Sequence, residues 1–203
     1  DNPYQRLEPI TSRQYEIGAK SKLIDGLMLS AAYFDIDKPL QAVSSVDNLF
    51  KTEGRQRHKG LELAANGQMT KQLSGILGMA WLDAKQSGTG DADVDGQRPA
   101  GVPRFQASAF LDYRLTAVPG LSLNGGVYHM GNRPLTGTHS TMVPSYTRVD
   151  LGAAYTMRVL GKPSILRLTV LNAANKRYWE SVVYGTVGAA QPRIVRLSLT
   201  TQF

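Results

Sequence analysis

Hydrophobic and polar residues alternate with a period of two along most of this 203-residue chain. Val149, Leu151 and Tyr155 share one face of their segment, and Arg148 and Asp150 share the other. This pattern is typical of β-strands, whereas helical spacing is scarce, so an all-β fold is expected. We expect nine strands, at Ser12–Lys20, Gly26–Asp37, Gln56–Asn66, Ser74–Gln86, Pro103–Leu115, Leu121–Gly131, Ser145–Arg158, Ser164–Ala173 and Pro192–Gln202.

The strand lengths and the order of the connections favour a barrel that crosses a membrane. The strands exceed the soluble mean of about 5 to 6 residues and suit a tilted strand in a bilayer. Short and long connections alternate, as in outer-membrane barrels with short periplasmic turns and longer extracellular loops. The short ones are Ser21–Asp25, Gly67–Leu73, Thr116–Gly120 and Val159–Pro163, and the long ones are Lys38–Arg55, Ser87–Val102, Asn132–Pro144 and Ala174–Gln191. Periodicity alone leaves open a soluble sandwich with one solvated face.

The parity of the strands predicts a larger protein. If the long loops are extracellular, the first and the last strand both run inward, which requires an odd number of strands. Bacterial single-chain barrels have an even number. We therefore expect at least one further strand before Asp1 and interpret the chain as the C-terminal portion of a larger barrel, since open edges would be unpaired in lipid.

Composition and motifs argue against an enzyme and against nucleic-acid binding. The chain has no Cys, which excludes a disulfide framework, a thiolate metal site and a cysteine nucleophile. No Ser-His-Asp order, nucleophile elbow or phosphate-binding glycine loop occurs, so no catalytic residue is assigned. The net charge of +7 is spread over polar strand faces and loops without interleaved aromatic residues, so no nucleic-acid partner is expected.

Metal-binding patterns are weak. The histidines are His58, His129 and His139. No two of them have a metal-binding spacing such as i, i+4, so no metal site is expected. Asp91, Asp93 and Asp95 suggest a calcium loop, but the glutamate and the flanking helices of an EF-hand are missing, which favours a solvated loop.

Five segments and the terminal Phe203 carry a resemblance to a known family. The segments are Leu7–Lys20 (LEPITSRQYEIGAK), Lys59–Leu63 (KGLEL), Val102–Phe105 (VPRF), Asp150–Tyr155 (DLGAAY) and Leu171–Trp179 (LNAANKRYW). In this order and spacing they resemble the C-terminal half of TonB-dependent outer-membrane receptors. Tyr178-Trp179 and Pro192-Arg193 look most like the ferric-siderophore branch.

The resemblance implies about nine C-terminal strands of an antiparallel 22-stranded transmembrane β-barrel in the outer membrane of a Gram-negative bacterium. An N-terminal plug would occlude the barrel, and the TonB–ExbB–ExbD complex would drive transport. The plug, the TonB box and the earlier strands lie outside this sequence. The expected function is import of a ferric siderophore, with iron entering only as the bound chelate and no cofactor of the protein's own. Alternatives are uptake of haem or another TonB-dependent substrate, a structural or adhesive barrel that anchors surface loops, and a soluble all-β binding module.

Candidate site residues follow from the strand map and the resemblance. The siderophore would bind among the loops around Leu40–Phe50, Thr89–Gly96, Arg133–Val143 and Trp179–Ala190. The substrate-binding candidates are Trp81, His139, Tyr178, Trp179 and Tyr184, with His139 the candidate for haem. The alternative role for Trp81, Tyr178 and Trp179 is in an aromatic girdle at the membrane interface. The candidates for the lumen and for contact with the plug are Arg148, Asp150, Arg158, Arg167 and Arg196.

Two further partners are expected at the membrane. Arg57 and Lys59 lie where a strand leaves the extracellular surface, and they are candidates for binding the phosphates of lipopolysaccharide, with a plain solvated rim as the alternative. Phe203 ends the last strand, and the resemblance implies that the barrel-assembly machinery reads it as an assembly signal. Physically it would sit in the periplasmic aromatic girdle.

Overall fold

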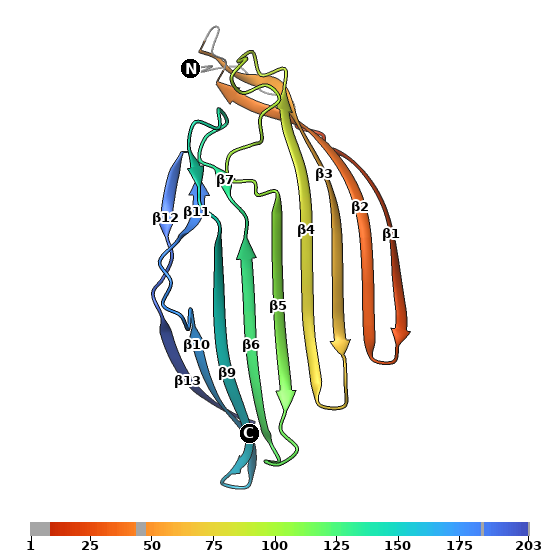
Figure 1. Cartoon of the computed structure of the whole chain (residues 1–203), viewed down its shortest axis with the longest axis vertical. Coiled ribbons are helices and arrows are strands. Elements are labelled where there is room, and N and C mark those ends of the chain that lie inside the picture. The colour runs from red at the N-terminus through yellow and green to blue at the C-terminus, as the bar shows by residue number, and fades with distance from the viewer. Residues whose placement is uncertain (1–8, 44–47, 184, 203) are drawn as a thin grey trace.

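One antiparallel sheet of nine strands dominates the computed structural model, which describes residues 9–43, 48–183 and 185–202 (Figure 1). The strands are β1 (Arg13–Ile24), β2 (Leu27–Val43), β3 (Phe50–Gln68), β4 (Leu73–Ser87), β5 (Phe105–Arg114), β6 (Leu121–Met130), β9 (Tyr146–Val159), β10 (Lys162–Leu171) and β13 (Ile194–Thr201). Each pairs with the next in this order. The nine expected strands and the all-β fold class are therefore confirmed. No helix in the described ranges is long and apolar enough to span a membrane.

Short turns and long connections lie at opposite ends of the sheet (Figure 1). We call these the short-turn end and the long-loop end. β1 begins at the long-loop end and β13 ends at the short-turn end, as the sequence predicts. The turn between β9 and β10 is tight because Leu160 and Gly161 both adopt positive φ, of 50° and 78°, a combination that suits a two-residue hairpin loop.

Two hairpins in the long connections were not expected. They are β7 (Arg133–Pro134) with β8 (Met142–Val143), and β11 (Trp179–Val183) with β12 (Thr186–Ala189). These strands have two to five residues, too few for alternation to show in the sequence.

The expected long loop Lys38–Arg55 is wrong, because β2 and β3 continue as a paired hairpin through most of it. Pairing resumes at Gln41 with Thr52 after a register shift beyond Pro39. Proline lacks the N–H that a ladder bond needs, which accounts for an irregularity at this point.

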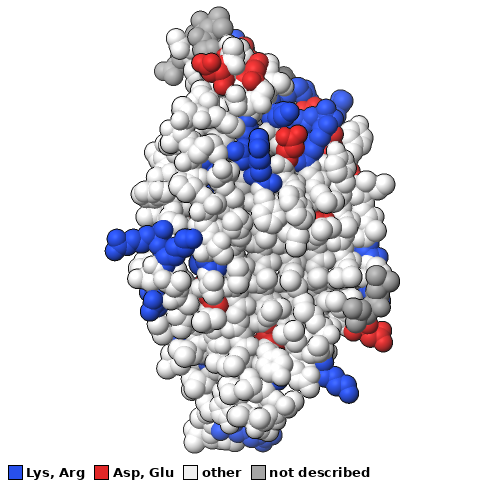
Figure 2. All heavy atoms as spheres, viewed as in Figure 1, with Lys and Arg blue, Asp and Glu red and all other residues white. Residues whose placement is uncertain are grey.

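The register divides the sheet into an apolar and a polar face. Val127 pairs with Val149, and Leu168 pairs with both Ala153 and Leu197, so large apolar side chains from neighbouring strands share one face. Many of them are exposed, such as Leu197 at 70%. A continuous exposed apolar band is the outer surface of a membrane barrel, with polar residues facing the lumen. The middle of the sheet carries few charged side chains in Figure 2, and they gather at the long-loop end.

Aromatic side chains border the apolar band. On β5, Phe105 lies toward the long-loop end and Tyr113 toward the short-turn end, both on the apolar face. Their separation along the strand is about 26 Å at about 3.3 Å per residue, and about 20 Å after a tilt of about 40°. This is close to the height of a membrane-facing band of about 25 Å.

Candidate functional site

The polar face is hollowed in its half toward the long-loop end. A concavity of about 520 Å³ lies over β3 to β6 and β9, and its polar lining includes Glu62, Gln106, Ser108, Tyr128 and Arg148. The register explains this lining, because these residues occupy paired or neighbouring positions on the polar face of successive strands. Apart from Arg148 and Glu62, the polar side chains of this wall are uncharged. Such a surface can bind a polar solute through several weak contacts.

Arg148 holds the centre of an ionic and aromatic cluster at this concavity. Its guanidinium contacts the Asp150 carboxylate at 3.1 Å and the Glu180 carboxylate at 3.7 Å. Its Cζ lies 4.5 Å from the centroid of the Tyr128 ring, a cation–π distance. The positive charge is thus shared among two carboxylates and an aromatic face.

Asp150 also anchors the connection that follows β10. Its Oδ1 accepts a hydrogen bond from the backbone N–H of Asn172 at 2.8 Å. The Asn172 side chain in turn donates to the carbonyls of Lys176 and Gln191 at 2.9 and 3.1 Å, which fastens both ends of this connection.

The sequence-predicted arginines all lie on the polar face. Arg148, Asp150 and Arg158 share one face of β9, Arg167 pairs with Ala154 of that face, and Arg196 pairs with Thr169 beside Arg167. The structure brings Arg148 and Asp150 together. Contact of these residues with a plug stays a prediction.

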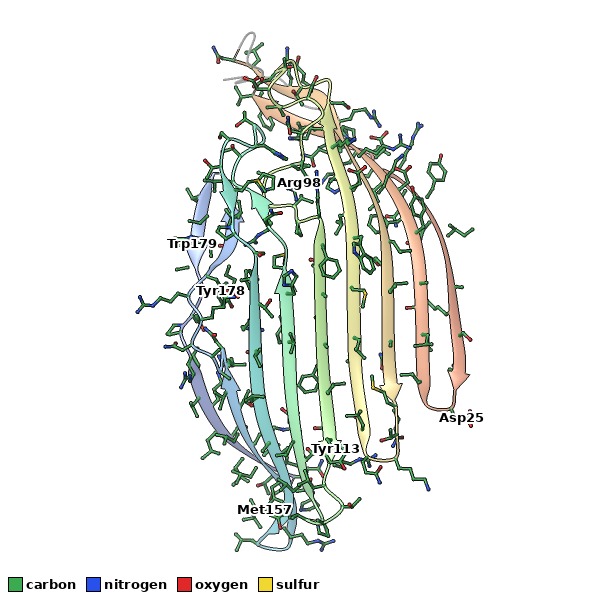
Figure 3. The ribbon with its side chains drawn as sticks, viewed as in Figure 1. Asp25, Arg98, Tyr113, Met157, Tyr178 and Trp179 are labelled. Carbon is green, nitrogen blue, oxygen red and sulfur yellow. The ribbon has the colours of Figure 1, made fainter. Side chains whose placement is uncertain are left out.

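Tyr178 ends the connection between β10 and β11, and Trp179 is the first residue of β11 (Figure 3). The Tyr178 ring stacks on Tyr146 with centroids 4.0 Å apart and an interplanar angle of 23°. Trp179 is 46% exposed. A stacked phenol pair at the edge of the concavity is a surface on which a partly apolar ligand can rest. Tyr184 and Phe203 lie outside the described residues.

The structure places Trp81 on the face that disfavours the predicted role in substrate binding. Trp81 pairs with Leu61 and Phe105 on the apolar face, opposite the concavity. Its ring lies 5.1 Å from Phe105, which lies 5.8 Å from His129 on the next strand. This row favours the alternative that the sequence left open, an aromatic girdle at the long-loop end.

His139 belongs to a joint between two loops. Its Nε2 lies 3.0 Å from both the backbone N and the carbonyl O of Arg98, and it accepts from the N–H or donates to the carbonyl according to its tautomer. A haem ligand needs a free imidazole nitrogen aimed at open space, and Nε2 is engaged within the protein. This geometry favours a structural role for His139.

The acidic loop after β4 uses its oxygens internally. The Asp95 carboxylate accepts hydrogen bonds from the N–H of Gly88 and from the N–H and hydroxyl of Thr89, at 2.8 to 3.1 Å. These bonds, those from Thr89 first, hold the pKa of Asp95 below its usual value. Asp91 Oδ1 accepts from the Asp93 N–H at 2.9 Å. The carboxylates therefore serve as turn caps.

Charged residues on the outer face are paired across strands. Arg57 makes two hydrogen bonds to Asp35, at 2.8 and 2.6 Å, and Arg55 makes a similar pair with Asp37. Lys59 Nζ lies 4.0 Å from the Asp35 carboxylate. The register places Arg57 and Lys59 toward the long-loop end, beyond the apolar residues Leu61 and Leu63 of the same face.

Sequence reasoning missed two buried arginines in the long connections, Arg98 and Arg133, which are 7% and 5% exposed. No pattern distinguishes them from solvated loop arginines, since their partners are backbone carbonyls of other loops. Burial first, and then the charge of Arg104, lowers the pKa of Arg98.

Comparison with known proteins gives one consistent result. The family described as "TonB dependent receptor-like, beta-barrel" matches residues 1–175. The chain is 31% identical over 198 residues to the ferrichrome receptor FcuA of Yersinia enterocolitica, covering 96% of this chain and 26% of that protein. It is 32% identical over 205 residues to the metal-pseudopaline receptor CntO of Pseudomonas aeruginosa, covering 97% and 28%.

Among solved structures, the ferric preacinetobactin receptor BauA of Acinetobacter baumannii is similar, with a TM-score of 0.85 and 26% identity. The match covers 95% of this chain and 29% of BauA. The chain thus spans about a quarter of the length of the curated relatives that it matches.

Proposed function

Because this chain belongs to the TonB-dependent receptor β-barrel family, we propose that it is part of the wall of a receptor that imports a ferric siderophore. It is a transmembrane β-barrel segment of the Gram-negative outer membrane. The long-loop end is extracellular and the short-turn end periplasmic. The names of FcuA and BauA as ferrichrome and ferric preacinetobactin receptors support this class of substrate.

The observation that carries the proposal is the polar concavity at the extracellular end, with the Tyr146–Tyr178 stack and Arg148. A chelate that displays amide, hydroxyl and aromatic groups finds matching partners on this wall. Tyr178 and Trp179 are the proposed ligand contacts. Iron enters as part of the chelate, and TonB–ExbB–ExbD supplies the energy through parts of the receptor beyond this chain.

The arginines farther down the same face are proposed to contact the plug. Arg158 lies near the short-turn end, and Arg167 and Arg196 lie side by side across β10 and β13. Their guanidinium groups offer several donors each to a polar plug surface.

Lipopolysaccharide is the proposed partner of the outer surface. Lys59 and Arg104 line a hollow of about 470 Å³ whose floor includes Tyr33 and Trp81. Arg57 is held by Asp35, so Lys59 is the more available cation for a phosphate of lipid A. Phe203 is the proposed signal for the barrel-assembly machinery.

Two alternative functions predict different results in a binding experiment. A structural or adhesive barrel would bind no chelate. A haem receptor would bind haem in preference to iron chelates; His139, the candidate ligand for haem, has its Nε2 engaged by the Arg98 backbone.

Equilibrium binding to the purified full-length receptor tests the proposal. Titration with ferrichrome, ferrioxamine B, a ferric catecholate and haem should give saturable binding of one ferric chelate. Tyr178→Ala should weaken that binding, and Trp81→Phe, on the lipid-facing surface, is the matched control that should leave it unchanged. Absence of binding to every ferric siderophore tried, or preference for haem, would overturn the proposal.

A further inference from the structure

Three extracellular connections, the described residues of 88–104, 131–145 and 172–193, meet around two buried arginines. A guanidinium has five N–H donors and carries a charge, so its burial is costly unless carbonyls or carboxylates accept those donors. Arg98 and Arg133 are both almost fully buried, and the partners of each lie in a different connection from its own. Each arginine is therefore a joint between two loops.

The first joint links 88–104 to 131–145. Arg98 Nη1 donates to the Asn132 carbonyl at 3.2 Å, and the Arg98 backbone shares a hydrogen bond with His139 Nε2, which lies 3.0 Å from both its N and its O. Three residues later, the Gly101 N–H donates to the Pro134 carbonyl at 2.9 Å. Three hydrogen bonds thus hold these two connections together over a short stretch of chain.

The second joint links 131–145 to 172–193. Arg133 Nη1 donates to the Glu180 carbonyl at 3.0 Å, and Nη2 donates to the Trp179 carbonyl at 2.9 Å. The Arg133 guanidinium also lies 5.8 Å from the Tyr146 ring, the ring on which Tyr178 stacks. One planar fork therefore holds two successive carbonyls of the segment that carries Tyr178 and Trp179.

We infer that Arg98 and Arg133 couple the three connections into one cooperative body, in which Arg133 is the positioning residue for Tyr178 and Trp179. This part of the vestibule wall is then preformed, and its three loops do not move as separate flaps. The ligand role of Tyr178 and Trp179 rests on the proposed function, but the coupling does not. Segments that share buried hydrogen bonds open together, so loss of one joint should loosen all three connections.

Hydrogen exchange on the full-length receptor without any chelate tests the coupling. Arg133→Met removes both carbonyl bonds and should raise exchange about tenfold or more in 172–193, in 131–145 and also in 88–104, which Arg133 does not touch. Arg133→Lys keeps the charge but not the fork, and should rescue protection only in part. The matched control is Arg177→Met, an exposed arginine of the same connection, which should leave all three unchanged.

A rise confined to 172–193, full rescue by Arg133→Lys, or no change at all would overturn the inference. If Arg133→Met assembles poorly, Arg98→Met is used instead, because it breaks the joint between 88–104 and 131–145. A rise in hydrogen exchange confined to 88–104 in that variant would also overturn the inference. Because no chelate is present, a receptor that binds no siderophore would still show the coupling. Failure of the proposed function and failure of this inference are therefore distinguishable.

Discussion

Asp150 offers a sharp test of how the extracellular half of the wall is held together. Asp150 is 8% exposed, and its carboxylate has two partners at once. One oxygen accepts from the N–H of Asn172, itself 2% exposed, and the other pairs with Arg148 at 3.1 Å. Asp150→Ala removes both interactions, and Asp150→Asn keeps an oxygen for Asn172 while removing the negative charge.

The two variants should differ in free energy. Leaving the buried Asn172 N–H without an acceptor costs about 1–3 kcal/mol. Loss of the ion pair adds about 1 kcal/mol, since Arg148 keeps Glu180 and the Tyr128 ring. Asp150→Ala should therefore destabilise the start of the 172–193 connection by about 2–4 kcal/mol, and Asp150→Asn by about 1 kcal/mol. Each 1.4 kcal/mol raises the equilibrium constant for local opening about tenfold.

Hydrogen exchange of peptides that contain residues 172–176 measures this difference. Exchange should rise about 30-fold or more in Asp150→Ala and about fivefold in Asp150→Asn. Asp25→Asn, in an exposed turn at the periplasmic end, should change nothing there. Equal effects of the two Asp150 variants would refute the reasoning, because the charge and not the hydrogen bond to Asn172 would then hold the connection.

Three further predictions concern the lipid face, the acidic loop and lipopolysaccharide. Leu197→Arg puts a charge on the apolar face and should cost about 2–4 kcal/mol near the bilayer midplane, whereas Ser198→Arg on the polar face should cost far less; denaturant titration of the full-length barrel in lipid compares them. The lowered pKa of Asp95 means that its stabilisation of the 88–95 loop is complete above the ordinary aspartate pKa of about 3.9 and is lost as pH falls through the lower folded value. The protection of this loop against exchange, relative to the intrinsic rate at each pH, should therefore fall on acidification in the wild type, and an equal fall in Asp95→Ala, which lacks the titrating group, would contradict this. Replacing Lys59 with Gln should reduce co-purified lipopolysaccharide more than replacing Arg57, and unchanged retention in the double variant would remove that proposal.

The long strands could be predicted because their two faces meet different solvents. Along β9, lipid selects Leu151 and Tyr155 while water in the lumen permits Arg148 and Asp150, so alternation persists for the whole strand. The upper part of the β2–β3 hairpin was missed because it rises beyond the apolar band, where both faces meet water and alternation is lost.

The candidate site was harder to predict, for two physical reasons. The face of Trp81 is ambiguous in sequence because β4 carries apolar residues on both faces, with Met79 beside it and Leu82 on the polar side. The burial of Arg98 and Arg133 depends on carbonyls contributed by loops far away in the sequence, such as those of Asn132 and Glu180, and backbone carbonyls leave no trace in a residue pattern.

The most direct test of the account is uptake of radioactive iron by cells that carry the full-length receptor as their single siderophore receptor. The account predicts that one ferric siderophore enters when both the receptor and TonB are present. It also predicts that Tyr178→Ala lowers this uptake while Trp81→Phe does not. Uptake that continues without TonB, or no uptake of any ferric siderophore, would contradict the account.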